Sequence, residues 1–168
     1  MLLRDLPVRD VMVTDVLTFR TDDNVQDAMR ALVLGDIDGA PVVDDDGAVV
    51  GLLSTGDLIV EEARLHLPTV ITLLGAVLEL PSSKRRFEDD LEKALGATVG
   101  EVMSETVSTV GPDDTFETAA TVMHEENQDR LPVVDGSGVL VGIIARGDIV
   151  RAIVRDADAR GSHDVSGG

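Results

Sequence analysis

The feature of this sequence that most constrains its fold is an internal repeat with a period of 91 residues, the separation between Asp57 and Asp148. Shifted by that period, residues 8–60 align with residues 99–151 without a gap, and roughly a third of the paired residues are identical. Two copies of one supersecondary unit explain such self-similarity. Because two copies are too few for a solenoid, we expect them to pack on each other as a closed pair.

Each copy predicts the same elements in the order β-α-β-β-α, which places the chain in the α/β (α+β) class. An acidic pair, Asp22-Asp23 or Asp113-Asp114, suits a helix start, and apolar residues then recur at helical spacing. The turns "DDDG" and "DGSG" between apolar runs indicate hairpins. The expected elements are extended runs at 16–19 and 106–110, helices at 24–35 and 115–126, a strand on each side of each hairpin turn, and final helices that open near Gly56-Asp57 and Gly147-Asp148.

The repeat also divides the chain into parts. We expect the first repeat at residues 1–60, a linker at 61–98 and the second repeat at 99–155. The linker contains a predicted helix near 83–95, whereas the apolar stretch 67–80 fits a helix, a strand or a packed connector. From about Asp156 the tail has little apolar surface to bury, so residues 156–168 are expected to be disordered.

The composition is strongly acidic. The formal net charge is −18, from 32 acidic residues against 14 lysines and arginines. Such a surface repels DNA, RNA and anionic membranes at ordinary salt, and the aromatic content of 2% leaves few stacking platforms for single-stranded nucleic acid. Because molar salt shortens the Debye length to about 3 Å, dense surface carboxylates become tolerable there. In this respect the chain resembles halophilic, haloarchaeal proteins.

Several classes of site and location are disfavoured. The chain has no cysteine, which excludes disulfides and thiolate chemistry, and its three histidines form no recognisable metal spacing. The beginning of the chain is charged too early for a secretory leader, and no apolar stretch is long enough to span a bilayer. We therefore expect a cytoplasmic protein without a bound metal. No nucleophile–base pair or Walker-type phosphate loop is present, so we expect no enzymatic activity.

The repeated motifs carry a family resemblance. "VRDVM" with "APVVDDDGAVVGLLSTGD", and "VGEVM" with "RLPVVDGSGVLVGIIARGD", resemble tandem CBS domains, the pair known as a Bateman module, of the stand-alone prokaryotic type. The resemblance implies that the repeats pack through their sheets with pseudo-two-fold symmetry and that two modules join as a homodimer. It also implies two clefts per module that bind adenosine compounds such as AMP, ADP, ATP or S-adenosylmethionine, with no cofactor required.

The same resemblance assigns candidate site residues. Asp57 and Asp148 match the ribose-binding aspartate of the family's motif, since a carboxylate can accept hydrogen bonds from both ribose hydroxyls. A hydroxyl three residues earlier can bind phosphate; Ser54 supplies it in the first copy, but Ala145 in the second cannot. Arg146 and Arg130 are the candidate phosphate ligands of the second copy. By family position the adenine walls would be Thr18, Ala40 and Pro41 in the first copy and Thr109, Leu131 and Pro132 in the second.

Other interpretations of these residues remain open. A phosphate could sit between the copies, shared by Ser54 and Arg130. Asp57 and Asp148 are equally typical of helix caps, Ser54 could be a simple cap, and Arg130 and Arg146 could pair with surface acids. We therefore carry two functions: a non-enzymatic sensor that binds an adenosine ligand and reports to an unknown effector protein, and a structural dimerisation module whose clefts are vestigial.

Overall fold

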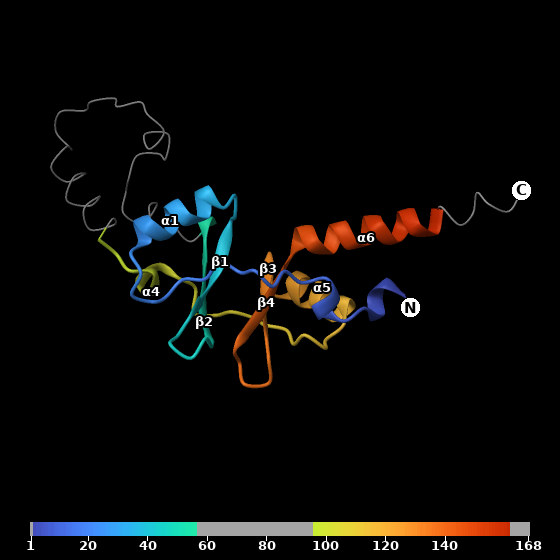
Figure 1. The fold of residues 1–168 in the computed structure, drawn as a ribbon, viewed down its shortest axis with the longest axis horizontal. Helices are drawn as coiled ribbons and strands as arrows, with labels where there is room; N and C mark the ends of the chain where they lie inside the picture. Colours follow the sequence, from blue (N-terminus) through green and yellow to red (C-terminus); the bar gives the residue numbers. More distant parts are fainter. Residues whose placement is uncertain (1, 57–95, 162–168) are drawn as a thin grey trace, which may run out of the picture. The chain divides into compact units, whose positions relative to one another are not determined.

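The computed structural model describes residues 2–56 and 96–161 (Figure 1). Most of the predicted helix that opens near Gly56-Asp57, the predicted helix near 83–95 and the stretch 67–80 lie outside the described residues. Within the described ranges each repeat has the predicted helix followed by two strands, and in the second repeat the predicted final helix follows them. The elements are η1 (Leu3–Asp5), η2 (Val8–Asp10), α1 (Val25–Leu34), β1 (Gly39–Val43), β2 (Val49–Ser54), α4 (Val99–Val102), α5 (Phe116–Glu125), β3 (Arg130–Val134), β4 (Leu140–Ala145) and α6 (Arg146–Gly161).

Helices α1 and α5 begin and end at equivalent positions of the two repeats. Asn24 caps α1 by accepting hydrogen bonds from the backbone N–H groups of Gln26 and Asp27, and Thr115 caps α5 through the N–H of Thr118. Just past the helices, Asp36 and Asn127 adopt left-handed backbone conformations with φ of 51° and 50°. Asp and Asn tolerate this conformation better than most residues, so both repeats end the helix by the same local chemistry.

Both predicted hairpins are present. β1 pairs with β2, and β3 pairs antiparallel with β4 in a register that places Arg130 opposite Ala145 and Leu131 opposite Ile144. At the turns, Gly47 and Gly138 have φ of +81° and +82°, a conformation that glycine adopts without strain. The extended runs predicted before α1 and α5 do not form full strands. Each makes a single parallel bridge to a neighbouring strand, Phe19 to Val42 and Val110 to Val133.

The compact units of the structure do not coincide with the sequence repeats. One unit, called unit 1, consists of Met1–Leu17, Val43–Val50 and Thr106–Gly168; the other, unit 2, consists of Thr18–Val42 and Gly51–Glu105. The expected division at 1–60 and 99–155 follows the sequence repeat and stays a prediction, and the compact units differ from it at the start of each repeat. The segment that begins the first repeat belongs to the unit built mainly from the second, and the segment that begins the second repeat belongs to the other unit.

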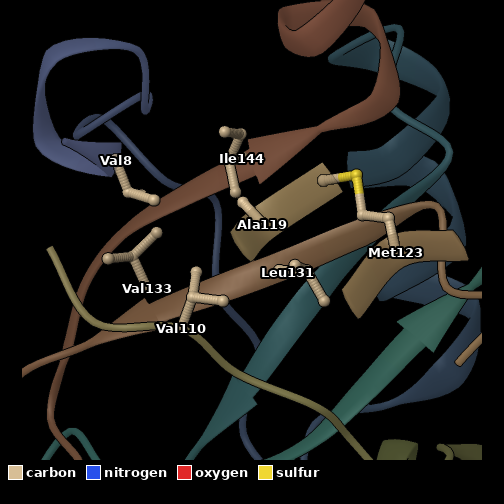
Figure 2. Packing of buried hydrophobic residues seen from close by; sticks show 7 residues of the cluster. All are labelled: Val8, Val110, Ala119, Met123, Leu131, Val133 and Ile144. Atoms are coloured by element: carbon tan, nitrogen blue, oxygen red, sulfur yellow. The ribbon is translucent and has the colours of Figure 1, made fainter. Parts of the chain in front are cut away.

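The core of unit 1 shows how the N-terminal segment is held. Val8 is fully buried, and its N–H donates to the carbonyl of Asp114 at 2.8 Å. Val13 forms an antiparallel bridge with Ile143 on the free side of β4. Figure 2 shows Val8 facing side chains from α5, β3 and β4 across one apolar cluster, whose members are Val8, Val110, Ala119, Met123, Leu131, Val133 and Ile144.

Unit 2 repeats this arrangement with the equivalent residues. Val99 is fully buried at the start of α4, and its N–H donates to the carbonyl of Asp23 at 2.8 Å. Ser104 forms an antiparallel bridge with Leu52 of β2, as Val13 does with Ile143 in unit 1. The two segments that begin with Val8 and Val99 have therefore exchanged repeats in a reciprocal manner.

Helix α6 corrects one prediction. Residues 156–161, expected to belong to a disordered tail, are helical and continue α6 to Gly161. Alanine recurs in this segment and is the strongest helix former, and Arg160 pairs with Asp156 one turn earlier at 2.7 Å. Local helix propensity extends the helix here although the segment has little apolar surface to bury. Residues 162–168 lie outside the described residues.

Candidate functional site

The predicted site residues of the second repeat meet where β4 ends and α6 begins. Arg130, the first residue of β3, pairs with Ala145, the last residue of β4, and α6 starts at the next residue. The N–H of Arg146 donates to the carbonyl of Asp129 at 2.9 Å, which ties the start of α6 to the residue before β3. We call this region, residues 108–110, 128–132 and 145–151, the second-repeat corner. All of it belongs to unit 1.

The residues predicted to form an adenine wall lie side by side in this corner. The N–H of Val110 donates to the carbonyl of Pro132 at 3.2 Å, and Val110 forms a parallel bridge with Val133. Thr109 therefore runs alongside β3. Leu131 and Pro132 are fully buried, whereas Thr109 is exposed. The three residues lie together as expected, and Thr109 is the exposed member of the group.

The side chain of Gln128 fixes this grouping, a role that the sequence analysis missed. Its Oε1 accepts from the N–H of Ser108 at 3.0 Å, and its Nε2 donates to the carbonyls of Ser108 at 2.9 Å and Arg130 at 2.8 Å. One side chain thus holds the extended segment that carries Thr109 against the start of β3. The equivalent residue of the first repeat is Ile37, and this difference between the repeats was the available signal.

Asp148 occupies the first turn of α6, and both of its carboxylate oxygens accept hydrogen bonds from the chain itself. Oδ2 accepts from the N–H of Ala145 at 2.8 Å, and Oδ1 accepts from Nη2 of Arg151 at 2.5 Å. The side chain is only 10% exposed. The contact with Ala145 is the backbone half of a capping box, so the helix-start role that we considered for this residue is present. Its ribose role stays a prediction.

The two candidate phosphate ligands of this corner differ in their surroundings. Nε of Arg146 lies 3.0 Å from Oδ1 of Asp129, and both side chains are largely exposed, so the pairing with a surface acid that we considered is present. Exposed ion pairs of this kind contribute little stability and exchange readily. Arg130 is half-buried at the start of β3, directly opposite Ala145. Neither phosphate role is tested by these contacts.

The corresponding corner of the first repeat is described in part. The N–H of Phe19 donates to the carbonyl of Pro41 at 3.0 Å, which brings Thr18 alongside Ala40 and Pro41 as in the second repeat. Ala40 and Pro41 are buried, and Thr18 is exposed. Ser54 is half-buried at the end of β2. Asp57 lies outside the described residues.

Three further expectations can be placed against the structure. A phosphate shared by Ser54 and Arg130 joins residues of different units and stays a prediction. Among residues 2–56 and 96–161, no group of three or more histidine, aspartate or glutamate side chains is placed to hold a metal ion. Within the same part of the chain, each helix is too short or too polar to cross a bilayer.

Comparisons with known proteins agree with this architecture. The family model described as "CBS domain" matches residues 8–64 and 99–155. The protein MJ1426 of Methanocaldococcus jannaschii is 34% identical over 153 residues, which cover 88% of this chain and 90% of that protein. The match spans both repeats and the residues between them.

Solved structures resemble the chain in the same way. The CBS domain of a CBS domain-containing membrane protein from Sphaerobacter thermophilus has a TM-score of 0.70 and 30% identity, and 89% of each chain is covered. CBSX2 of Arabidopsis thaliana, crystallised in complex with AMP, has a TM-score of 0.67 and 28% identity, covering 89% of this chain and 96% of that one.

Proposed function

Because the chain belongs to the CBS-domain family and carries two copies of the domain, we propose that it is a regulatory module that binds an adenosine-containing ligand. The ligand would be AMP, ADP, ATP or S-adenosylmethionine. The chain would act without catalysing a reaction, and its change on binding would be sensed by another protein. A ligand that prefers one arrangement of the chain shifts the population toward that arrangement by its difference in affinity.

The observation that carries the proposal is the paired construction of the two corners. In each repeat an exposed threonine lies along a strand whose second and third residues are apolar and buried, Ala40-Pro41 or Leu131-Pro132. The next strand ends at Ser54 in the first repeat, and in the second repeat it leads into α6, whose first turn bears Asp148; both residues are candidate polar ligands. Polar groups held in fixed positions on a buried apolar support suit the hydroxyls of a ribose and the polar edge of a base. The similarity to CBSX2, a protein crystallised with AMP, supports the same ligand class.

Thermal unfolding with added ligands tests this function. In high-salt buffer, a ligand present at about 100 times its Kd stabilises the folded chain by about 2.7 kcal/mol. For a chain of this size that corresponds to a rise in Tm of about 5 °C or more. We expect such a rise with at least one of AMP, ADP, ATP and S-adenosylmethionine, and a loss of most of it in the double variant Asp57→Asn, Asp148→Asn. GMP serves as the matched control for base recognition.

A dimerisation module with unused clefts is the second candidate. It is favoured by the engagement of both Asp148 oxygens within the chain and by the exposed apolar side chains on α6, namely Val150, Ile153 and Val154 at 58%, 48% and 53% exposure. Analytical ultracentrifugation separates the two functions. A concentration-independent dimer with no thermal shift from any adenosine compound would favour the dimerisation module and contradict the sensor.

A further inference from the structure

The ion pair between Asp148 and Arg151 distinguishes the second-repeat corner from the corresponding corner of the first repeat. Arg151 is 64% exposed, and its guanidinium donates to a carboxylate that is 10% exposed. The guanidinium also lies over the backbone of the helix start, since a Cβ built on Gly147 would come within 3.2 Å of Nη1. In the first repeat the residue equivalent to Arg151 is Val60, which has no charge with which to engage Asp57.

We propose that Arg151 is a specificity-determining residue of the second-repeat corner, which selects phosphorylated adenosine compounds over the uncharged nucleoside. This inference rests on the proposed function and deepens it. Arg151 competes with a ribose for Oδ1 of Asp148. A ligand that uses this carboxylate must displace the guanidinium, and only a ligand with an anionic group offers that guanidinium a new charged partner.

The energetic argument compares the hydrogen bonds before and after binding. A charge-assisted hydrogen bond between guanidinium and carboxylate is roughly twice as strong as a neutral one. A nucleoside would replace it with neutral hydroxyl bonds and return the guanidinium to water. A nucleotide places a phosphate near the same corner, and arginine binds phosphate oxygens in the bidentate geometry that it uses for carboxylates.

The location of Arg151 permits this exchange of partners. Its Cα lies one turn after Asp148 on α6, and the exposed side chain has several rotatable bonds, so it can release the carboxylate without movement of the backbone. Arg146 has its own partner in Asp129 and is not needed to hold Asp148. The exchange of partners therefore involves only the pair Asp148–Arg151, and Arg130 and Arg146 remain separate candidate phosphate ligands of the same corner.

Isothermal titration with AMP and adenosine at one fixed salt concentration tests the proposal. The variant Asp57→Asn removes the predicted ribose carboxylate of the first repeat and isolates the second corner. In that background we expect AMP to bind about tenfold more tightly than adenosine, the effect of one hydrogen bond to a charged group. Adding Arg151→Val, the residue of the first repeat, should weaken AMP binding, strengthen adenosine binding and bring the two affinities within about threefold. Arg151→Lys keeps the charge and should keep the preference for AMP.

The outcomes separate the two proposals. If the wild type binds AMP but Arg151→Val leaves the ratio of AMP to adenosine affinity unchanged, the role of Arg151 is wrong and the sensor function stands. If AMP binding is lost in Asp57→Asn and not regained with Arg151→Val, the second corner takes no ligand, and the role of Arg151 is again wrong. If the wild type binds no adenosine compound, the proposed function fails and this inference fails with it. Circular dichroism confirms that each variant is folded.

Discussion

Replacing Val8 with alanine should destabilise the second repeat rather than the first, to which Val8 belongs in sequence. Val8 is fully buried in the cluster of α5, β3 and β4. The substitution removes two buried carbon groups, worth about 1.6 kcal/mol by burial alone. The cavity that remains raises the expected loss to about 2 kcal/mol.

Native-state hydrogen exchange followed by mass spectrometry measures this loss in each unit separately. A destabilisation of about 2 kcal/mol speeds exchange by about 30-fold for amides that open with unit 1. We expect the increase in peptides that cover Phe116–Glu125 and Arg130–Val134, more than a hundred residues from the substitution. The mirror variant Val99→Ala should increase exchange in Val25–Leu34 instead, because Val99 is fully buried in unit 2.

The control is the same substitution at an exposed site. Val33 on α1 is 78% exposed, so Val33→Ala should change stability by less than about 0.5 kcal/mol. The reciprocal exchange of segments would be refuted if Val8→Ala speeded exchange in α1 and β1 as much as in α5 and β3. It would equally be refuted if Val8→Ala and Val99→Ala affected the same peptides.

Two further predictions concern the second-repeat corner and the acidic surface. Gln128→Ile introduces the residue of the first repeat and removes the hydrogen bonds to Ser108 and Arg130, so it should lower the free energy of unfolding, measured by chemical denaturation, by about 1–3 kcal/mol. The reverse change Ile37→Gln, at a site 36% exposed, should lower it by less than about 0.5 kcal/mol. Equal effects of the two substitutions would contradict the positioning role of Gln128. The midpoint temperature of thermal unfolding should rise between about 0.1 and 2 M KCl, because the added ions shorten the Debye length from about 10 Å to less than 3 Å and screen the repulsion within a chain of net charge −18. A midpoint temperature that is constant or falls over this range would contradict the halophilic interpretation.

The parts of the fold that the sequence predicted are those set by local chemistry. The helices expected at 24–35 and 115–126 are observed at Val25–Leu34 and Phe116–Glu125, because polar caps, helical periodicity and left-handed end residues all act within a few residues. The hairpins follow from turn residues in the same way. Each of these signals depends only on residues within the segment that forms the helix or the hairpin.

The exchange of the initial segments could not be predicted by the same means. "VRDVM" and "VGEVM" have the same apolar pattern, and the cores that receive them are built from equivalent residues. The apolar pattern alone therefore gives no preference for either core. Only the tertiary arrangement of the whole chain decides between them, and no local pattern carries that information.

The contacts of the second-repeat corner were missed for a related reason. Gln128 and Arg151 act through side-chain geometry that depends on the register of β3 and on the starting residue of α6, and a motif fixes neither. Their one visible signal is that they differ from Ile37 and Val60, the equivalent residues of the other repeat. A comparison of the repeats position by position at the ends of the strands would have drawn attention to both.

The differences between the repeats are informative because of where they occur. Within the corner motif, glycine and aspartate are identical in both copies at 56–57 and 147–148, whereas Ser54 is replaced by Ala145 and Val60 by Arg151. The shared residues mark the expected strand-to-helix turn, and the differing ones change the hydroxyl and the charge of the proposed ligand corner. If both corners bind, they should therefore rank ligands differently by charge.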